Sequence, residues 1–457
     1  MKFKYIISIF VISVFFSCSD SFTDLAPISQ RNAGIFYETA SDMEVAVNAI
    51  YSTMKSDGCY NQSYWVMQEL RSDNTFWDGT GLAEEITVFD KFTDISTSNI
   101  TEDAWNASYQ GISRANIVLA RIGAIDMDAT LKNRLTSEAL FLRSLYYYHL
   151  AVAFGNIPLI LTETASVDEG QTHTQVSASA VFNQLIGDLT KAESDLPQSY
   201  GSADVGRATK GAAATLLARI QLTNGDNGGA ESTLRRILGY GYTLVPDYAD
   251  LWGADNENNS ESIFEVQFEG GFGDQGNSFT SQFHGVLSVP VTSGQRNIPE
   301  RDLDDEYEAG DLRFAASLEG VTIDNTGWPI KYGMTNAFGD DDAPNNWVVF
   351  RYADVLLMLA EAIGEGDEAY GFINEVRMRA GLGDIDANTA GTFAEKLLHE
   401  RRVELAFENH RWADLLRFGV AESVMSAHGK PVNGKLLFAI PQRELDLNSN
   451  FSQNPGY

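Results

Sequence analysis

The chain has 457 residues, of which 44% are hydrophobic and 21% are charged, so it can bury a large core and is not expected to be disordered. Its formal net charge of −31 repels nucleic-acid phosphates and anionic polymers at long range, which excludes a nucleic-acid partner and favours neutral ligands. The two cysteines are too few for a disulfide framework, and we expect Cys59 to be a buried, inert thiol.

The first 17 residues indicate a secretion signal. Two lysines precede an apolar run from Tyr5 to Phe16 that is too short to span a bilayer, and Ser17 stands directly before Cys18. This order resembles a bacterial lipoprotein signal, and an ordinary signal peptide with an incidental cysteine is the alternative. We expect removal of residues 1–17 and lipidation of Cys18, which would anchor the chain to membrane lipid without spanning the bilayer.

Beyond a polar tether at residues 18–40, apolar residues recur at helical spacing over most of the chain. For the first helix, Ser41 is the expected N-cap and Glu44 completes a capping box. His149 is expected to be a core residue, because it lies in a helix that is apolar on several faces. Short Gly and Asn turns between helices favour helical hairpins, although no strict repeat of about 34 residues is visible. The expected helices cover residues 41–54, 105–122, 131–154, 178–195, 209–222, 229–238, 350–363, 368–380 and 392–418.

Two regions lack this periodicity. Residues 56–99 are loop-rich, and residues 240–349 are rich in Gly, Asn and Asp, with a short apolar run from Ser262 to Phe268 that predicts a strand. A long irregular segment inside a compact protein indicates a functional insert. We therefore predict an all-α fold, in which a helical scaffold over about 41–239 and 350–457 holds a loop-rich insert over about 240–349.

The segment ERRVELAFENHRWADLLRFG, from Glu400 to Gly419, combines an apolar stripe with opposite charges. Arg401 and Glu404 are three residues apart, as are Glu408 and Arg411, so each pair is predicted to form on the surface of one continuous helix. Arg351, in an earlier segment, is also expected to pair within the scaffold. The apolar stripe comprises Leu398, Leu405, Trp412 and Leu416.

No catalytic, cofactor or metal pattern is present in the sequence. His399 and Glu400 begin a zincin-like motif, but the position of the second histidine is Val403. Asp340 to Asp342 lack the alternating geometry of a calcium loop, and no nucleophile elbow occurs. We therefore expect no catalytic residue, no cofactor and no metal site. A surface glycosidase stays an alternative, because its test is a distance between carboxylates that the sequence does not give.

Aromatic and planar polar residues in loops are the remaining candidates. Sugar rings present apolar C–H faces and many hydroxyls, so glycan sites stack them on Trp or Tyr and orient them with polar side chains. Asp73, Asn74 and Trp77 lie together in RSDNTFWDG, and Trp328 and Tyr332 flank a proline turn in TGWPIKYG. We predict that these five residues contact a ligand, and core packing or loop anchoring is the alternative for each aromatic residue.

Several segments resemble the SusD/RagB family of Bacteroidetes surface lipoproteins. Ser19 and Asp20 after the cysteine resemble the export signal of such lipoproteins. RSDN resembles the family motif RGD-N, with Ser72 in place of glycine, and Phe451 stands where the family ending has leucine. The matching segments are SFTDLAPISQRNAGIFYETASDMEVAVNAIYSTM, EALFLRSLYYYHLAVAFGNIPLIL, FRYADVLLMLAEA, ERRVELAFENHRWADLLRFG and IPQRELDLNSNFSQNPGY.

The resemblance implies a tetratricopeptide-like scaffold and a binding protein without catalytic activity. It also implies an outer-membrane lipoprotein, anchored through Cys18 and facing the cell surface, that captures an oligosaccharide and delivers it to a SusC-like TonB-dependent transporter. In characterised members the ligand lies near the RSDN region and the insert. The acidic charge favours a neutral glycan. Peptide binding of the RagB type, and a purely structural partner of the transporter, are further alternatives.

Overall fold

The fold is defined by a computed structural model. Residues 1–35 lie outside the described part, so the predicted signal peptide, Cys18 and most of the tether are not placed. Among the described residues, no helix is both long enough and apolar enough to cross a membrane. The structure describes residues 36–77, 84–164, 166–272, 275–283, 296–319, 328–333 and 342–457.

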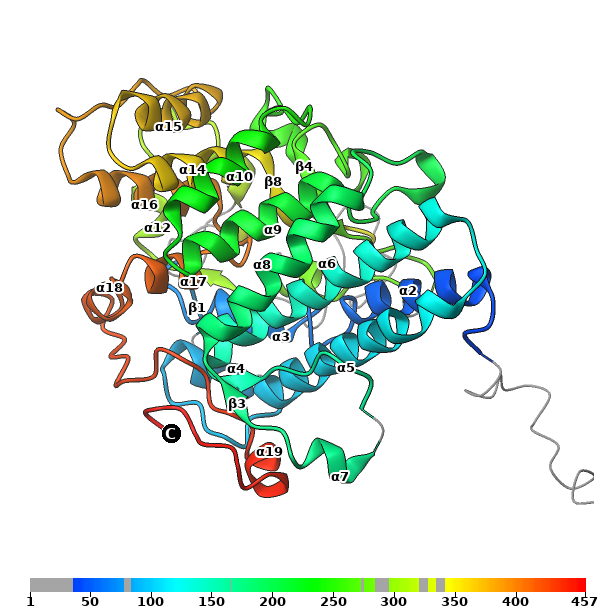
Figure 1. The fold of residues 1–457 in the computed structure, drawn as a ribbon. Helices are drawn as coiled ribbons and strands as arrows, with labels where there is room; N and C mark the ends of the chain where they lie inside the picture. Colours follow the sequence, from blue (N-terminus) through cyan, green and yellow to red (C-terminus); the bar gives the residue numbers. More distant parts are fainter. Residues whose placement is uncertain are drawn as a thin grey trace, which may run out of the picture.

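Long helices pack each against the next in chain order, and Figure 1 shows them side by side as hairpins. This arrangement confirms the all-α fold class. Consecutive helices pack against each other because each helix has an apolar stripe that it buries against its neighbours. The helices are α2 (Ala40–Thr53), α5 (Asn99–Arg121), α6 (Ala129–Phe154), α8 (Ala178–Asp195), α9 (Lys210–Thr223), α10 (Asn227–Ile237), α14 (Tyr352–Ile363) and α15 (Asp367–Arg379).

Helix α6 is central, because it contacts α5 on one side and α8 on the other. Its side chains are buried along most of the second half, which explains why that half is apolar on several faces. Gly155 ends the helix at a φ of 69°, a conformation that favours glycine. The prediction for His149 is confirmed: the hydroxyl of Tyr60 lies 2.7 Å from its Nε2 atom, and burial lowers the pKa of His149 to about 3.

The capping box of α2 lies two residues before the predicted one. The Thr39 hydroxyl accepts a hydrogen bond from the Asp42 backbone N–H at 3.2 Å, and the Asp42 carboxylate accepts one from the Thr39 N–H at 3.1 Å. The expected box of Ser41 and Glu44 is therefore wrong. Thr39 with Asp42 and Ser41 with Glu44 both have the spacing of a capping box. The Glu44 carboxylate instead forms an ion pair with Arg134 on α6, with 3.3 Å between Glu44 Oε1 and Arg134 Nη2.

Short elements occupy the regions predicted to be loops or an irregular tail, because such pieces are too short to show a helical or strand period. The short helices are α3 (Ser63–Gln68), α4 (Glu84–Asp90), α7 (Val167–Gly170), α11 (Phe279–Phe283), α12 (Leu303–Glu306), α13 (Phe314–Ser317), α18 (Ala421–Ala427) and α19 (Gln442–Leu447). The 3-10 helices are η2 (Ile122–Ala124), η3 (Ser202–Asp204), η4 (Tyr248–Leu251) and η5 (Ala254–Asn256).

The strands form small antiparallel pairs: β1 with β5, β2 with β3, β4 with β8, and β6 with β7. The predicted strand near 262 is confirmed as β4. Phe350 and Arg351 were predicted to begin a helix but belong to β8, because they pair with β4. The strands are β1 (Thr75–Phe76), β2 (Ile157–Pro158), β3 (Gln175–Val176), β4 (Ser262–Val266), β5 (Ile298–Pro299), β6 (Leu318–Glu319), β7 (Trp328–Pro329) and β8 (Trp347–Arg351).

The segment predicted as one helix over 392–418 is broken into α16 (Phe393–Glu404) and α17 (Arg411–Arg417). Phe407 and Asn409 between them have φ angles of 67° and 64°, which no α-helix accommodates. The predicted single helix is therefore wrong, and its charged residues point to several different elements.

The thiol of Cys59 is buried and free, and burial raises its pKa to about 12. Because the thiolate is the reactive form, we expect a soluble form starting after Cys18 to show no reaction with Ellman's reagent at pH 8 while it is folded. After denaturation the same sample should react at its single cysteine. Rapid reaction of the folded protein would contradict the burial of Cys59.

Candidate functional site

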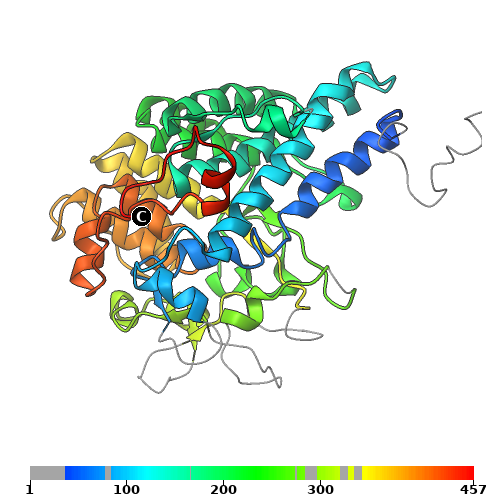
Figure 2. The ribbon, with the colours of Figure 1, turned by 90° about the horizontal axis from the view of Figure 1, so that it is seen from below.

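Four short strands bring together the two loops that the sequence predicted to bind a ligand. Strand β1 pairs with β5, β5 contacts β7, and β7 pairs with β6. Trp77 follows β1 directly, and Trp328 is the first residue of β7, so residues far apart in the sequence meet at one place. We call β1, β5, β6 and β7 the strand platform. Figure 2 shows the insert, in lime and green, along the lower side, opposite the hairpins of α8 to α10.

Asp73, just before β1, is buried and held by two arginines. Its carboxylate accepts hydrogen bonds from Arg411 Nε and Nη2, both at 2.7 Å, and lies 3.4 Å from Arg402 Nε. Burial by itself raises the Asp73 pKa, but Arg411 and Arg402 outweigh it and hold the pKa below its usual range. The backbone of Asp73 also accepts a hydrogen bond from Arg402. The RSDN loop is thereby fixed to α16 and α17.

Asn74 joins this loop to β5. Its side-chain oxygen accepts a hydrogen bond from Arg402 Nε at 3.2 Å, and its backbone oxygen accepts one from the N–H of Glu300 at 2.8 Å. The next aromatic residue, Trp77, is only 8% exposed, and its indole N–H has no partner among the described residues. This end of the platform is therefore packed and fixed by side chains that the sequence did not single out.

The residues after β7 are held in place by α16 and by the loop that follows it. The Lys331 ammonium donates to the backbone oxygen of Glu404 at 2.9 Å and to the Glu408 carboxylate at 2.8 Å. Tyr332 is buried and stacks on Trp347, with ring centroids 5.2 Å apart and an interplanar angle of 23°. The turn that leads out of β7 is therefore held by α16 and by the loop that follows it.

The five predicted ligand residues thus belong to one region. Asp73 and Asn74 bond to arginines, while Trp77 and Tyr332 are packed. The backbone of Trp328 lies in β7, and its side chain is outside the described part of the structure. Contact of these residues with a ligand stays a prediction.

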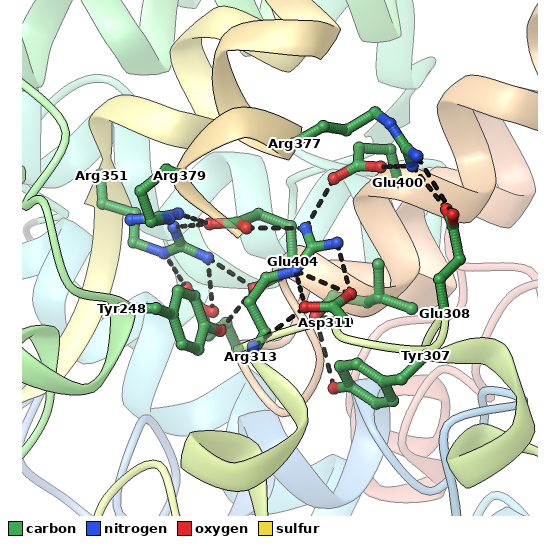
Figure 3. Close-up of polar contacts among 12 residues, drawn as sticks. Tyr248, Tyr307, Glu308, Asp311, Arg313, Arg351, Arg377, Arg379, Glu400 and Glu404 are labelled. Atoms are coloured by element: carbon green, nitrogen blue, oxygen red, sulfur yellow. Dashed lines mark hydrogen bonds and ion pairs between the residues drawn. The ribbon is translucent and has the colours of Figure 1, made fainter. Parts of the chain in front are cut away.

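Glu404 is the centre of a buried charge network, which Figure 3 shows between α16, β8 and the insert. Its carboxylate accepts hydrogen bonds from Arg313 at 3.0 Å, from Arg351 and from Arg379. Arg313 also bonds to Glu400 at 2.6 Å. All of these side chains are buried.

The predicted pairs of Arg401 with Glu404 and of Glu408 with Arg411 are wrong. Glu404 bonds to arginines of other elements, while Arg401 pairs with Asp354 and with Asp414, at 3.0 and 2.8 Å. The break between α16 and α17 is the reason, since it turns successive charged residues in different directions. The prediction that Arg351 pairs within the scaffold is confirmed, because its Nε lies 2.7 Å from a Glu408 oxygen.

Arg402, Arg411, Lys331 and Glu408 are the positioning residues that the sequence reasoning missed. Each is buried, and together they tie the platform and the residues next to it to α16, to α17 and to the loop between these helices. For Arg402, Glu408 and Arg411 the signal in the sequence is the high density of charge within an apolar stripe, whereas Lys331 stands alone between loop residues and gives no such signal.

Two family models match the chain, one described as the SusD family over residues 322–457 and one described as "starch-binding associating with outer membrane" over residues 22–222. The chain is therefore similar to SusD-like proteins in both its N-terminal and its C-terminal part. This SusD-like chain is 26% identical to SusD-like protein P2 of Formosa agariphila, over 100% of both chains. It is 27% identical to a SusD-like protein of Bacteroides ovatus, over 91% of this chain and 82% of the relative.

Solved structures of SusD-like proteins are also similar to this chain. A laminarin-binding SusD-like protein is 29% identical and superposes with a TM-score of 0.82, covering 92% of this chain and 100% of that chain. A SusD homolog from Bacteroides thetaiotaomicron is 26% identical, with a TM-score of 0.81 and coverages of 93% and 99%. The helical scaffold is therefore the SusD-like fold over almost the full length.

Proposed function

We propose that this SusD-like protein is a non-catalytic surface lipoprotein that binds a neutral oligosaccharide at the strand platform and delivers it to a SusC-like TonB-dependent transporter. The observation that supports this most is the meeting of the Trp77 and Trp328 segments across β5. The net charge of −31 disfavours anionic polymers. The laminarin-binding relative makes a neutral glucan the first ligand to test.

In this proposal Trp328 provides the face on which a sugar ring stacks. Trp77 and Tyr332 support the floor of the site, and Asp73 and Asn74 hold the loop in position. The ion pairs of Arg411 and Arg402 with Asp73 fix this geometry before a ligand arrives, which lowers the entropy lost on binding.

Delivery requires that the protein be held at the outer membrane by Cys18 and that it close over the transporter once it is loaded. A ligand shifts such an equilibrium only by its difference in affinity for the two states. The proposal therefore requires the glycan to bind more tightly in the closed complex than to the free lipoprotein.

We expect isothermal titration of the soluble form with neutral glycans to show binding that Trp328→Ala weakens by roughly thirtyfold, because a central aromatic contact contributes about 2 kcal/mol. Met378→Ala, at a side chain that is 67% exposed on α15, is the control and should leave binding unchanged. Laminarin, other neutral polysaccharides, uronate polymers and peptides form the panel.

Each other result points to a different function. Binding of peptides without any glycan would favour the RagB-like alternative. Release of reducing ends during the titration would indicate a glycosidase. No heat with any ligand would contradict the platform as a binding site and favour a structural partner of the transporter.

A further inference from the structure

A concave region lies along α5, and it shares no residue with the strand platform. It is a groove of about 540 Å³ between α5, the segment of residues 158–173, and α19 with the tail that follows. We call it the α5 groove. Figure 1 shows α7 and α19 on the same side of α5, away from β1. Its volume is within the range of about 300–1,000 Å³ that is typical of small-molecule sites.

The walls of the α5 groove are held in place by hydrogen bonds. Asn116 on α5 donates to the backbone oxygens of Ile160 and Thr162, at 2.9 and 3.2 Å. On the opposite wall, the Asn448 amide donates to the backbone oxygen of His173 at 2.9 Å. These hydrogen bonds fix the walls relative to one another, so binding of a ligand would need little reordering of the chain.

The lining combines aromatic rings with polar groups that have no partner. The rings of Tyr109 and Phe451 are partly exposed. The side chains of Asn106 and Gln171 are exposed to solvent and make no hydrogen bond to the described residues, so they are free to bond to a ligand. The Nε2 atom of His173 is shielded from solvent and also has no partner in the part of the chain that the structure describes.

The charges of the α5 groove restrict its ligand. Among the described residues that line it, none is Lys or Arg, and Glu444 is the acidic one. A site for a phosphate, a sulfate or a uronate would need cations. Rings that offer a flat apolar face, together with amides and an imidazole that offer hydrogen bonds, instead match the C–H faces and hydroxyls of an uncharged sugar.

We propose that the α5 groove is a second binding site for a neutral glycan. The inference rests on the proposed function for the class of ligand, but it uses no residue of the platform. It gives the lipoprotein two independent contacts with glycan, one at the platform and one at α5.

The test is isothermal titration of the soluble form with neutral hexasaccharides: laminarihexaose, maltohexaose, xylohexaose and mannohexaose. We expect two glycans per chain for the unmodified protein and one for Ser113→Trp, which places a bulky ring at an exposed groove position on α5. Thr190→Trp, at an exposed position on α8 outside the groove, is the control and should keep both sites. Trp328→Ala should retain the groove site.

A second variant, which removes polar groups instead of adding a bulky ring, tests whether the groove binds glycan through hydrogen bonds. Asn106→Ala with Gln171→Ala removes two hydrogen-bonding groups that no wall residue uses, and it should weaken the groove site by roughly thirtyfold. One glycan per chain, lost in Trp328→Ala and kept in Ser113→Trp, would overturn the groove inference alone. Binding lost in Ser113→Trp and unaffected by Trp328→Ala would support the groove and contradict the platform. No binding of any hexasaccharide would overturn both.

Discussion

Replacing Glu404 by Gln is expected to lower the free energy of unfolding by about 3–5 kcal/mol, because it removes a buried carboxylate that three buried arginines share. The carboxylate accepts hydrogen bonds from Arg313, Arg351 and Arg379, and Figure 3 shows these guanidinium groups converging on it. Burial by itself raises the Glu404 pKa, but Arg379, Arg351 and Arg313 together hold it below its usual range. The folded protein therefore contains the charged form.

Urea denaturation at pH 7 of the soluble form measures this effect. Glu422→Gln, at an exposed position on α18, is the matched control and should change the unfolding free energy by less than about 0.5 kcal/mol. A Glu404→Gln variant as stable as the control would show that the remaining carboxylates compensate the arginines, and it would contradict the central role of Glu404.

The second large effect is a loss of stability in acid. The pKa of Asp414 is lowered to about 2, since Arg401 and Arg417 outweigh the effect of burial, and the pKa values of Asp73 and Glu404 are lowered as well. In the unfolded chain these groups titrate near pH 4. Their stabilisation is therefore present above about pH 4 and is lost as the pH falls through the folded values.

At higher pH the Glu69 carboxyl lowers the stability of the folded state as the pH rises. Burial raises the pKa of Glu69 to about 8, although the backbone N–H of Asn409 donates to it. Between its unfolded value near pH 4.5 and its folded value near 8, the folded state binds more protons, so stability falls as the pH rises. Together the two effects predict a maximum of stability near pH 5 to 6, at about the lower end of the usual range.

Urea midpoints from pH 3 to pH 9 test this profile. Asp414→Asn should be less stable than the unmodified chain at pH 7 and should lose part of the decline between pH 5 and pH 3, where about 1 kcal/mol depends on Asp414. Glu69→Gln should flatten the decline between pH 5 and pH 8. Midpoints that do not change between pH 7 and pH 3 would contradict the assignment of the buried ion pairs.

Much of the fold could be predicted from the sequence, because an amphipathic helix has a period that local residues display. The expected limits of the helices that became α6, α8 and α15 lie within about two residues of those observed. Short elements such as α3 and β1 were missed for the same reason, since a few residues do not establish a period. The first helix was found, but its cap was assigned to Ser41 where Thr39 caps it.

The candidate site was predictable only in part. The sequence singled out the segments that contain Trp77 and Trp328, on the chemistry of aromatic residues in loops and on family resemblance. Their meeting through β5 depends on strand pairing between distant residues, which no local pattern encodes. The α5 groove was also not predicted, because its walls come from three separate parts of the chain.

The sequence by itself determined the helical scaffold and the SusD-like family, because periodicity and motifs are properties of neighbouring residues. The tertiary structure alone decided the partners of Glu404 and Arg411. Glu404 and Arg411 lie near opposite charges in the sequence, yet they bond to Arg351 and Asp73. A buried charge is stabilised by whichever opposite charges the folded chain brings within about 3 Å, and sequence spacing does not contain that distance.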